Sequence, residues 1–412
     1  MEKTNIQELI TKWSNTAELG SMSIENLSED LKENMAILME AQDNIKVMNE
    51  GMSTTSIGEL GASAAYKPIS LALMRRTFPA LFAQNCVGIQ AMNTPVGLAY
   101  VLRVIYGESS GVNGPEAAWD QVPIYSGFSG STSGTSATYS TSGAGTGAST
   151  SEAEAWKIGT DFPQLKLILE SVAITAKSRK LAASFSLEAA EDISAMQNID
   201  IQREIVRVLQ YEIIAEMDRE IIGKLKTTAV TGTGGAAAKQ LDLNATSGTS
   251  FVDGRWSQEQ ISSIVTSIVH QSNTIAVTTR RGAGNFAIVS PAVATALQAA
   301  RPNFCGNDPK VNPTQAGVAE IGTINSTIKV FRDQYASGDY ALVGYKGEGQ
   351  NDAGVILSPY IMNAMNTATD YRDFSPVIGV RSRYAVTDSL LGAGRYYRLV
   401  QYSNLSKIIA GY

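Results

Sequence analysis

Residues 200–227 have the sequence DIQREIVRVLQYEIIAEMDREIIGKLKT, in which apolar side chains recur every three or four positions. This periodicity predicts a long helix with Asn198 or Asp200 as its N-cap. At about 1.5 Å per residue, the helix would run about 40 Å. Its expected apolar face comprises Ile201, Ile205, Val208, Leu209, Met217, Ile221 and Leu225. We expect Ile205, Leu209 and Ile213 to point into the core of the domain built around this helix.

The same helix carries carboxylates interleaved with arginines: Glu212, Glu216, Asp218, Glu220, Arg203, Arg207 and Arg219. Paired carboxylates can perform general acid–base chemistry. Acids and bases that alternate at helical spacing are, however, typical of a solvent-exposed helix face. We therefore interpret these carboxylates as a charged surface.

Two strand-like segments flank a stretch of very small residues. Gly97–Tyr106 is rich in Val, Leu, Ile and Tyr, and Leu165–Phe185 alternates apolar with polar side chains, so both predict strands. Between them, 21 of the 26 residues of Ser126–Ser151 are Gly, Ser or Thr, and none is charged. Such a composition buries too little apolar area to offset its ordering entropy. The pattern predicts a long two-stranded loop with a mobile tip.

The C-terminal half alternates helices with short strands. Gly232–Gly235 ends the long helix, and Ser257 opens a second helix with Gln260 at the capping-box position. Asn285–Val289 predicts a buried strand, after which Pro291 takes the first position of a further helix. Shorter strands are expected at Ile328–Phe331, Tyr340–Tyr345, Gly354–Leu357, Val377–Tyr384 and Tyr396–Tyr402. Together these elements predict a mixed α+β fold.

The N-terminal segment differs from the rest of the chain in charge. Residues 1–50 hold ten acidic and four basic side chains, which accounts for the whole net charge of −6. From Ser23 to Met48, apolar residues at helical spacing predict an amphipathic helix. Residues 51–66 are rich in Gly, Ser, Thr and Ala and predict an extended arm.

Composition limits the classes of function. With 412 residues and 44% hydrophobic content the chain can bury a large core, and its lack of basic excess argues against nucleic-acid recognition. Cys86 and Cys305 have no paired spacing and the chain opens without a signal peptide, so we expect an intracellular, reducing compartment. A single histidine, His270, cannot supply a metal cluster, and we expect it on the solvated surface. We expect no catalytic, cofactor-binding or metal-binding residues.

Two glycine-rich motifs have weak functional interpretations. Residues 232–237 match the loose dinucleotide pattern G-x-G-x-x-A, but they follow a helix instead of a strand, which favours a flexible turn. Residues 280–285, RRGAGN, resemble a phosphate nest. We favour a tight turn into the strand at Asn285, with the arginines paired to an acidic loop or to a neighbouring subunit.

Many ordered segments of the chain resemble a single family, the T-even-type major capsid proteins of tailed phages, which share the Hong Kong 97 capsid fold. The segments are Met74–Gly107 with QAMNTPVG at 90–97, Ala176–Leu181 leading to Glu188 and Asp192, Arg281–Phe286, Asp333–Tyr335, Asp339–Tyr340, Val343–Gly347, Asp352–Gly354, Pro359–Tyr360, Phe374–Gly379 and Arg383–Tyr384. Matches in this order are more specific than any one motif.

The resemblance implies a division of the chain. The parts are an acidic N-terminal segment at 1–40, an N-arm with the entry to the peripheral domain at 41–96, an extended loop at 97–180 with its tip at 126–151, a peripheral domain with the long helix at 181–254, a mainly axial domain at 255–375, and a C-terminal return to the peripheral domain at 376–412. Relatives carry a folded insertion in the loop, where this chain has only the Gly/Ser/Thr stretch.

The resemblance also implies a function, which is self-assembly into hexamers and pentamers that form an icosahedral phage head around DNA. Expected partners are scaffolding protein, a prohead protease, a portal and vertex or decoration proteins, and the expected location is the virion after assembly in the host cytoplasm. Two other classes stay open: a bacterial nanocompartment (encapsulin-like) shell and a Ser/Thr-rich surface-layer or adhesin subunit. A portal, tail or genome in the particle would distinguish the phage head from the nanocompartment.

The resemblance further implies N-terminal processing by a protease that cuts after Glu in an Ile/Leu-x-Glu context. Leu38-Met39-Glu40 fits this context and is followed by the small Ala41, whereas Glu25 lacks the spacing and Glu59 precedes a bulky residue. Residues 1–40 carry eight acids and three bases, so the cut at Glu40–Ala41 would remove most of the net negative charge. The alternative is that residues 24–48 form a retained amphipathic helix.

Overall fold

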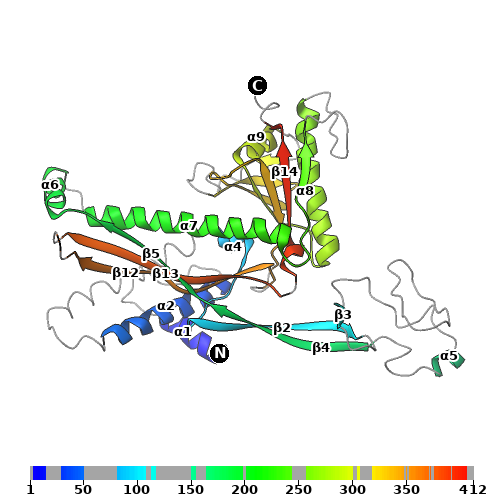
Figure 1. Cartoon of the computed structure of the whole chain (residues 1–412), viewed down its shortest axis with the longest axis horizontal. Helices are drawn as coiled ribbons and strands as arrows, with labels where there is room; N and C mark the ends of the chain where they lie inside the picture. Colours follow the sequence, from blue (N-terminus) through cyan, green and yellow to red (C-terminus); the bar gives the residue numbers. More distant parts are fainter. Residues whose placement is uncertain are drawn as a thin grey trace.

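The computed structural model of the chain describes residues 3–14, 29–50, 81–107, 113–116, 150–154, 164–197, 201–243, 257–299, 304–306, 318–347, 349, 352–370, 372, 375–390 and 392–405. Helices and strands are mixed throughout, as the α+β prediction requires (Figure 1). The helices are α1 (Lys3–Ser14), α2 (Glu29–Glu50), α4 (Ala83–Cys86), α5 (Thr150–Glu154), α6 (Leu187–Gln197), α7 (Ile201–Thr231), α8 (Ser257–Thr279), α9 (Pro291–Ala299) and the 3-10 helix η2 (Ala393–Tyr396).

The strands form three sheets. Their bounds are β1 (Gly88–Ile89), β2 (Val96–Gly107), β3 (Asn113–Glu116), β4 (Gln164–Thr175), β5 (Lys177–Ser184), β6 (Lys239–Asp242), β7 (Phe286–Val289), β8 (Phe304–Gly306), β9 (Ala319–Ile324), β10 (Ile328–Arg332), β11 (Tyr340–Gly344), β12 (Val355–Thr369), β13 (Pro376–Asp388) and β14 (Tyr397–Ser403). One sheet has the order β1-β12-β13-β5, the second β6-β14-β11-β7-β10-β9-β8, and the third β3-β2-β4.

Helix α7 is the long helix that the sequence predicts, and it lies across the sheet that contains β5 and β13 (Figure 1). Leu209 and Ile213 are buried in the large core beneath it, which confirms two of the three expected core residues. Ile205 is half-buried against the same core. The expectation for Val208 is wrong, because its side chain is 53% exposed beside the buried Leu209.

The seven-stranded sheet separates two hydrophobic cores. Successive side chains of a strand point to opposite faces. Phe286 and Ile288 of β7 therefore join α7 in one core, while Ala287 and Val289 join α8 and α9 in the other. A sheet covered on both faces favours a continuous apolar strand. This cover explains why the predicted strand at Asn285–Val289 has no polar positions beyond Asn285.

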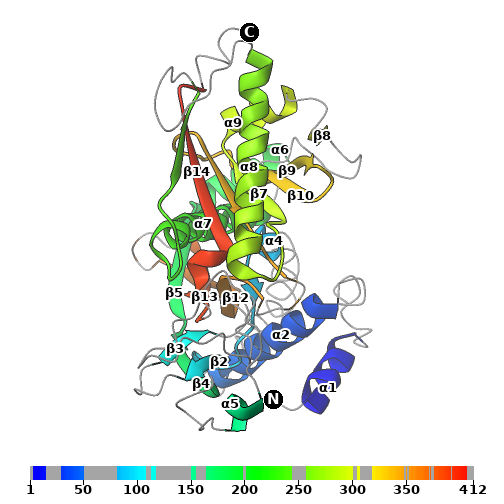
Figure 2. The same ribbon diagram turned by 90° about the vertical axis from the view of Figure 1, so that its right-hand side faces the viewer.

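Helices α1 and α2 pack side by side below the four-stranded sheet, on the side away from α7 (Figures 1 and 2). Met35, Leu38 and Met39 of α2 and Trp13 of α1 are buried in the same core as α7. The predicted amphipathic helix is confirmed from Glu29 onward, and its expected beginning lies outside the described residues. Helix α1 has no counterpart in the sequence predictions.

The predicted two-stranded loop is confirmed as a hairpin of β2 and β4. It extends away from two lobes, one formed by α7 with the four-stranded sheet and the other by the seven-stranded sheet with α8 and α9 (Figure 1). The expected strand Leu165–Phe185 is in fact two strands, because the chain leaves the hairpin at Ala176 and continues as β5 in a different sheet. Of the predicted mobile tip, Thr150 and Ser151 begin the short helix α5. The rest of the tip and the arm at 51–66 lie outside the described residues.

Two strands are much longer than predicted, and the C-terminal strands are shared between the four-stranded and the seven-stranded sheets. β12 and β13 pair along their whole lengths, but bulges near Pro359 and Ile361 interrupt the alternation that sequence patterns reveal. β12, which falls in the expected axial segment, lies in the four-stranded sheet. β14, which falls in the expected return to the peripheral domain, lies in the seven-stranded sheet. The two lobes are therefore interwoven by the C-terminal strands.

Candidate functional site

The hairpin presents an apolar surface that nothing in the described chain covers. Its large exposed side chains are between 52% and 67% accessible: Val96, Leu98, Tyr100, Leu167 and Leu169. Residues two apart on a strand share a face, and so do residues directly opposite one another in an antiparallel pair. Leu102 is opposite Leu169 and Val104 is opposite Leu167, so all five lie on one side. We call these five residues the hairpin face.

The opposite side of the hairpin makes contacts within the chain. Near its base, Ile174 is buried with Met92 and Ala385. Further along, Arg103 Nη1 donates to both carboxylate oxygens of Glu170, at 3.0 and 3.1 Å. The hairpin therefore has an anchored side and an exposed apolar side. Apolar patches of this kind on soluble proteins mark contacts with another molecule.

The candidate processing residues lie inside α2. Glu40 Oε2 accepts hydrogen bonds from Lys12 Nζ at 2.7 Å and from Trp13 Nε1 at 3.3 Å, so Glu40 joins α1 to α2. Ala41 is buried. The peptide bond between Glu40 and Ala41 is thus part of a packed helix. The other candidates, Glu25 and Glu59, lie outside the described residues.

The interpretation of the α7 carboxylates as a charged surface is correct for Glu212 and Glu216, which are exposed, and wrong for Asp218 and Glu220. α7 is covered by the segment before α4 on one side and by β5 and β13 on another. Asp218 points toward the first and Glu220 toward the second. Asp218 is buried against the segment before α4, where its Oδ1 accepts the backbone N–H of Phe82 at 3.2 Å. Desolvation raises the pKa of Asp218 to about 7, although the Phe82 hydrogen bond opposes the shift.

Glu220 connects α7 to two strands. The Tyr384 hydroxyl of β13 donates to Glu220 Oε2 at 2.6 Å, and Arg179 of β5 pairs with the other carboxylate oxygen. The Arg179 guanidinium also stacks on the Tyr384 ring, 3.9 Å from its centre. Burial raises the pKa of the Tyr384 hydroxyl, so it remains a donor. This cluster is structural in character, because the Tyr384 hydroxyl and the Arg179 guanidinium hold both carboxylate oxygens of Glu220.

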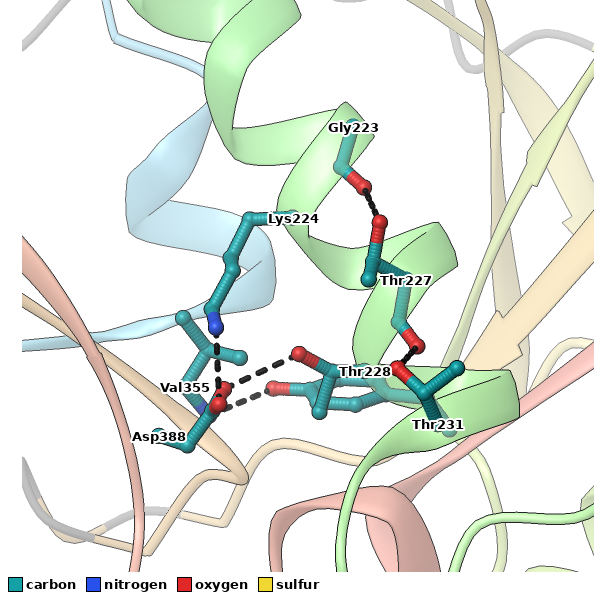
Figure 3. A network of polar contacts seen from close by, with 8 residues as sticks. Gly223, Lys224, Thr227, Thr228, Thr231, Val355 and Asp388 are labelled. Carbon is teal, nitrogen blue, oxygen red and sulfur yellow. Dashed lines mark hydrogen bonds and ion pairs between the residues drawn. The ribbon is translucent and has the colours of Figure 1, made fainter.

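A second polar network joins the end of α7 to the end of β13 (Figure 3). Asp388 accepts hydrogen bonds from Lys224 Nζ at 2.7 Å and from the Thr228 hydroxyl at 2.9 Å. Close by, the backbone N–H of Val355 donates to the Tyr397 hydroxyl at 3.0 Å. The network lies where the four-stranded and seven-stranded sheets meet, and it ties the end of α7 to the end of β13.

The two glycine-rich motifs are ordered turns. At Gly232–Gly235 the predicted turn is confirmed, and its backbone packs against η2, where Gly394 N donates to Thr233 O at 3.0 Å. A Cβ at Gly394 would lie 2.6 Å from Gly235 Cα and 2.7 Å from Gly232 O. The turn at residues 280–285 is confirmed, and Arg281 pairs with Asp352 in an acidic loop of the same chain. That pairing was one of the two partners expected.

Reactive side chains are dispersed in the part of the chain that the structure describes. His270 is exposed on α8, as expected, and Cys86 is a free, buried thiol whose pKa burial raises. Across the described ranges, His, Cys, Asp and Glu nowhere gather in threes suited to a metal ion. Among the helices described, none is both long and apolar enough to cross a membrane.

Sequence reasoning missed the functional meaning of the hairpin face. The available signal was that Gly97–Tyr106 is apolar at almost every position, instead of alternating like a strand with one wet side. It also missed Asp218 and Glu220, whose inward direction depends on which elements cover α7. No local pattern specifies that cover.

Comparison with protein families matches residues 63–403 to the major capsid protein Gp23. The match covers α4 through β14 and begins after α2. The major capsid protein of Salmonella phage ViI is 28% identical over 412 residues, which is 93% of this chain and 90% of that protein. That of Vibrio phage KVP40 is 26% identical over 414 residues, 82% and 77% of the two chains. That of Enterobacteria phage T4 is 26% identical over 403 residues, 79% and 76%.

Solved capsid structures are also similar. The mature capsid of bacteriophage PhiM1 has a TM-score of 0.44 at 9% identity, covering 79% of this chain and 87% of that one. The capsid of Myoviridae phage XM1 has a TM-score of 0.41 at 10% identity, covering 78% and 91%. The sequence matches favour the phage capsid over the nanocompartment and surface-layer alternatives. Because the family match spans both lobes and the hairpin, the chain belongs to the family of Gp23 major capsid proteins, the shell proteins of tailed-phage virions.

Proposed function

We propose that copies of this chain, on a Hong Kong 97-type fold, form hexameric and pentameric rings that close an icosahedral head around DNA. The observation that carries this proposal is the hairpin face, because an extended arm with an uncovered apolar side needs a neighbouring copy to remove that side from water. In this proposal α7 and the four-stranded sheet form the peripheral domain. The seven-stranded sheet with α8 and α9 forms the axial domain.

Substituting Leu169→Asp tests the role of the hairpin face. The charge would be solvated in the free subunit, so we expect the variant to fold with an unchanged circular dichroism spectrum. Burial of that charge between copies would be costly, so we expect no particles by electron microscopy and sedimentation. Val277→Asp, which charges an exposed apolar position on α8, is the matched control. Particles of Leu169→Asp at the wild-type yield would overturn the proposal.

Processing after Glu40 by a prohead protease belongs to the same proposal, as do contacts with scaffolding protein, a portal and vertex or decoration proteins. Support comes from the motif at Leu38–Ala41. Because the bond lies in a packed helix, the protease would act before α2 docks or after it is released. The intact mass of the subunit from DNA-filled particles tests this: a chain that begins at Met1 or Glu2 would contradict processing.

A further inference from the structure

The outer edge of β1 is covered by a side chain of α2 instead of by another strand. β1 is the edge strand of the four-stranded sheet, and its pairing with β12 continues beyond Ile89, since Gln90 N donates to Leu357 O at 3.0 Å and Met92 N to Pro359 O at 2.8 Å. Peptide groups alternate in direction along a strand, so the polar groups of Ile89 and Ala91 point away from β12. Among the described strands none pairs with this side of β1, and an unpaired edge is a template for another strand.

The side chain of Asn34 occupies this edge. Its Oδ1 accepts the backbone N–H of Ala91 at 3.1 Å, and its Nδ2 donates to the carbonyl oxygen of Ile89 at 3.5 Å. A residue of a parallel neighbouring strand would bond the same two groups, with its own C=O and N–H. The carboxamide has the donor and acceptor of a peptide group. Asn34 therefore replaces one residue of an absent strand.

Burial holds Asn34 in this position. Its own side chain is buried, and its neighbours Met35, Leu38 and Met39 are fully buried against the sheet. Glu33, on the other side of α2, is exposed. α2 thus covers the β1 edge with one polar contact and several apolar ones. All of these residues precede the Glu40–Ala41 bond.

We propose that α2 masks a strand-pairing edge at residues 88–92, and that an extended segment of a second copy of this chain takes the place of Asn34 when α2 is released. The physiological release rests on the proposed removal of residues 1–40. Backbone hydrogen bonds would supply the affinity, as in other cases of strand addition. In the unprocessed subunit the mask keeps the edge from premature pairing.

A second copy is the expected occupant for two reasons. The chain belongs to a family of shell proteins that assemble with themselves. The edge is also continuous with the hairpin face, because Met92 packs at the base of the hairpin and Val96 begins the exposed row four residues later. One neighbouring copy could therefore cover both surfaces.

The test uses the full chain and needs no protease. The double variant Asn34→Ala/Leu38→Ala weakens the packing of α2 and leaves the sequence of β1 unchanged. We expect this variant to self-associate at a concentration at least about tenfold lower than wild type, measured by analytical ultracentrifugation. Leu297→Ala removes an equally buried leucine from the other core and controls for lost stability. The proposal is overturned if this control associates as strongly as the double variant.

Adding Ala91→Pro to the double variant should reverse its increased self-association. Proline removes the outward N–H of residue 91 and leaves the bonds of Gln90 and Met92 to β12 in place. We expect association to return to the wild-type level. Persistent association would show that another surface is responsible and would overturn the strand-edge proposal. The proposed function is tested separately, by whether the Leu169→Asp variant forms particles.

Hydrogen exchange keeps the inference testable if the double variant fails to fold. In the single variant Asn34→Ala, the Ala91 amide should exchange at least about tenfold faster than in wild type or Glu33→Ala at low concentration. On assembly it should become protected again. Protection that is independent of concentration would indicate a partner within the same chain, and no protection on assembly would indicate an unused edge. Either result would overturn the proposal.

Discussion

The hairpin strand β2 and the central strand β7 have the same kind of sequence and opposite surroundings. β7, FAIV, is buried at every position, because α7 covers one of its faces and α8 and α9 cover the other. β2, VGLAYVLRVIYG, is equally rich in large apolar residues, yet Leu98 and Tyr100 are more than half exposed. The two strands differ in where their cover comes from.

An apolar strand must be covered by other side chains to leave water. Its sequence does not say whether those side chains belong to the same chain or to a neighbouring copy. For β7 the source is the same chain, so burial contributes to the stability of the isolated subunit. For β2 the source is proposed to be a neighbouring copy, so the same apolar area contributes to assembly. Substitutions in the two regions should therefore affect different measurements.

The largest effect is expected in the core beneath α7. Leu209→Ala removes a buried side chain and leaves a cavity, so it should lower the free energy of unfolding by about 2–5 kcal/mol. Val208→Ala, one residue earlier on the exposed side, should change it by less than about 0.5 kcal/mol. Denaturant unfolding of the isolated subunits measures both. Equal losses at the two positions would contradict the placement of α7.

An intermediate, pH-dependent effect is expected at Asp218. Its pKa is raised in the folded state to about 7, so between about pH 4 and pH 7 the folded chain binds a proton that the unfolded chain has released. Stability contributed by this group is therefore lost as the pH rises through that window. Asp218→Asn keeps the acceptor for Phe82 N and removes the charge, and should stabilise the subunit by about 1–3 kcal/mol at pH 8 relative to pH 4.

Melting temperatures of wild type and Asp218→Asn at both pH values measure this difference. Glu212→Gln, at an exposed position of the same helix, is the control and should show almost none of it. A constant difference between wild type and Asp218→Asn across the pH range would mean that Asp218 titrates normally.

A smaller effect is expected where the two sheets meet. Thr228→Val keeps the shape of a buried side chain and removes the hydroxyl that donates to Asp388, so it should cost about 1 kcal/mol. Thr227→Val removes a hydroxyl that bonds only to the Gly223 carbonyl of its own helix, on the exposed side, and should be near neutral (Figure 3). Equal unfolding free energies for the two variants would show that the Asp388 network adds nothing.

The smallest effect on the subunit is expected on the hairpin face. Leu98→Ser replaces an exposed leucine, so the melting temperature of the isolated subunit should stay within the change that about 0.5 kcal/mol produces. Assembly should nevertheless weaken, because apolar area between copies is lost. A large fall in subunit stability would show that the hairpin face is covered within the chain, and the comparison with β7 would fail.

Much of the fold follows from local patterns. The periodicity of residues 200–227 predicts α7, and the apolar run at Asn285–Val289 predicts β7 and its burial. Longer strands were missed where bulges near Pro359 break the alternation of β12. α1 was missed because a short amphipathic helix has a weak signal when its cover, here α2, is distant in sequence.

The candidate surfaces depend more on tertiary context. That Leu98 and Leu167 are exposed while Ile174 is buried cannot be inferred from residue type, since all three are aliphatic and lie in predicted strands. In the sequence, Asn34 is an ordinary polar residue of a predicted helix. Its hydrogen bond to the β1 edge can be recognised only from the structure. Family resemblance supplied the function, which composition alone did not.

The backbone contact between Gly235 and Gly394 has an evolutionary consequence. In a core, a larger side chain at one position can be offset by a smaller one opposite, so pairs of residues can drift together. Here a new Cβ at Gly394 would clash with backbone atoms of residues 232 and 235. A substitution changes only side chains, so it cannot remove these atoms. Neither glycine has a compensating partner mutation. The surroundings of this turn can vary, but a side chain at Gly394 would require the end of α7 to move away from η2, and one at Gly235 would require the chain to leave α7 by a different path.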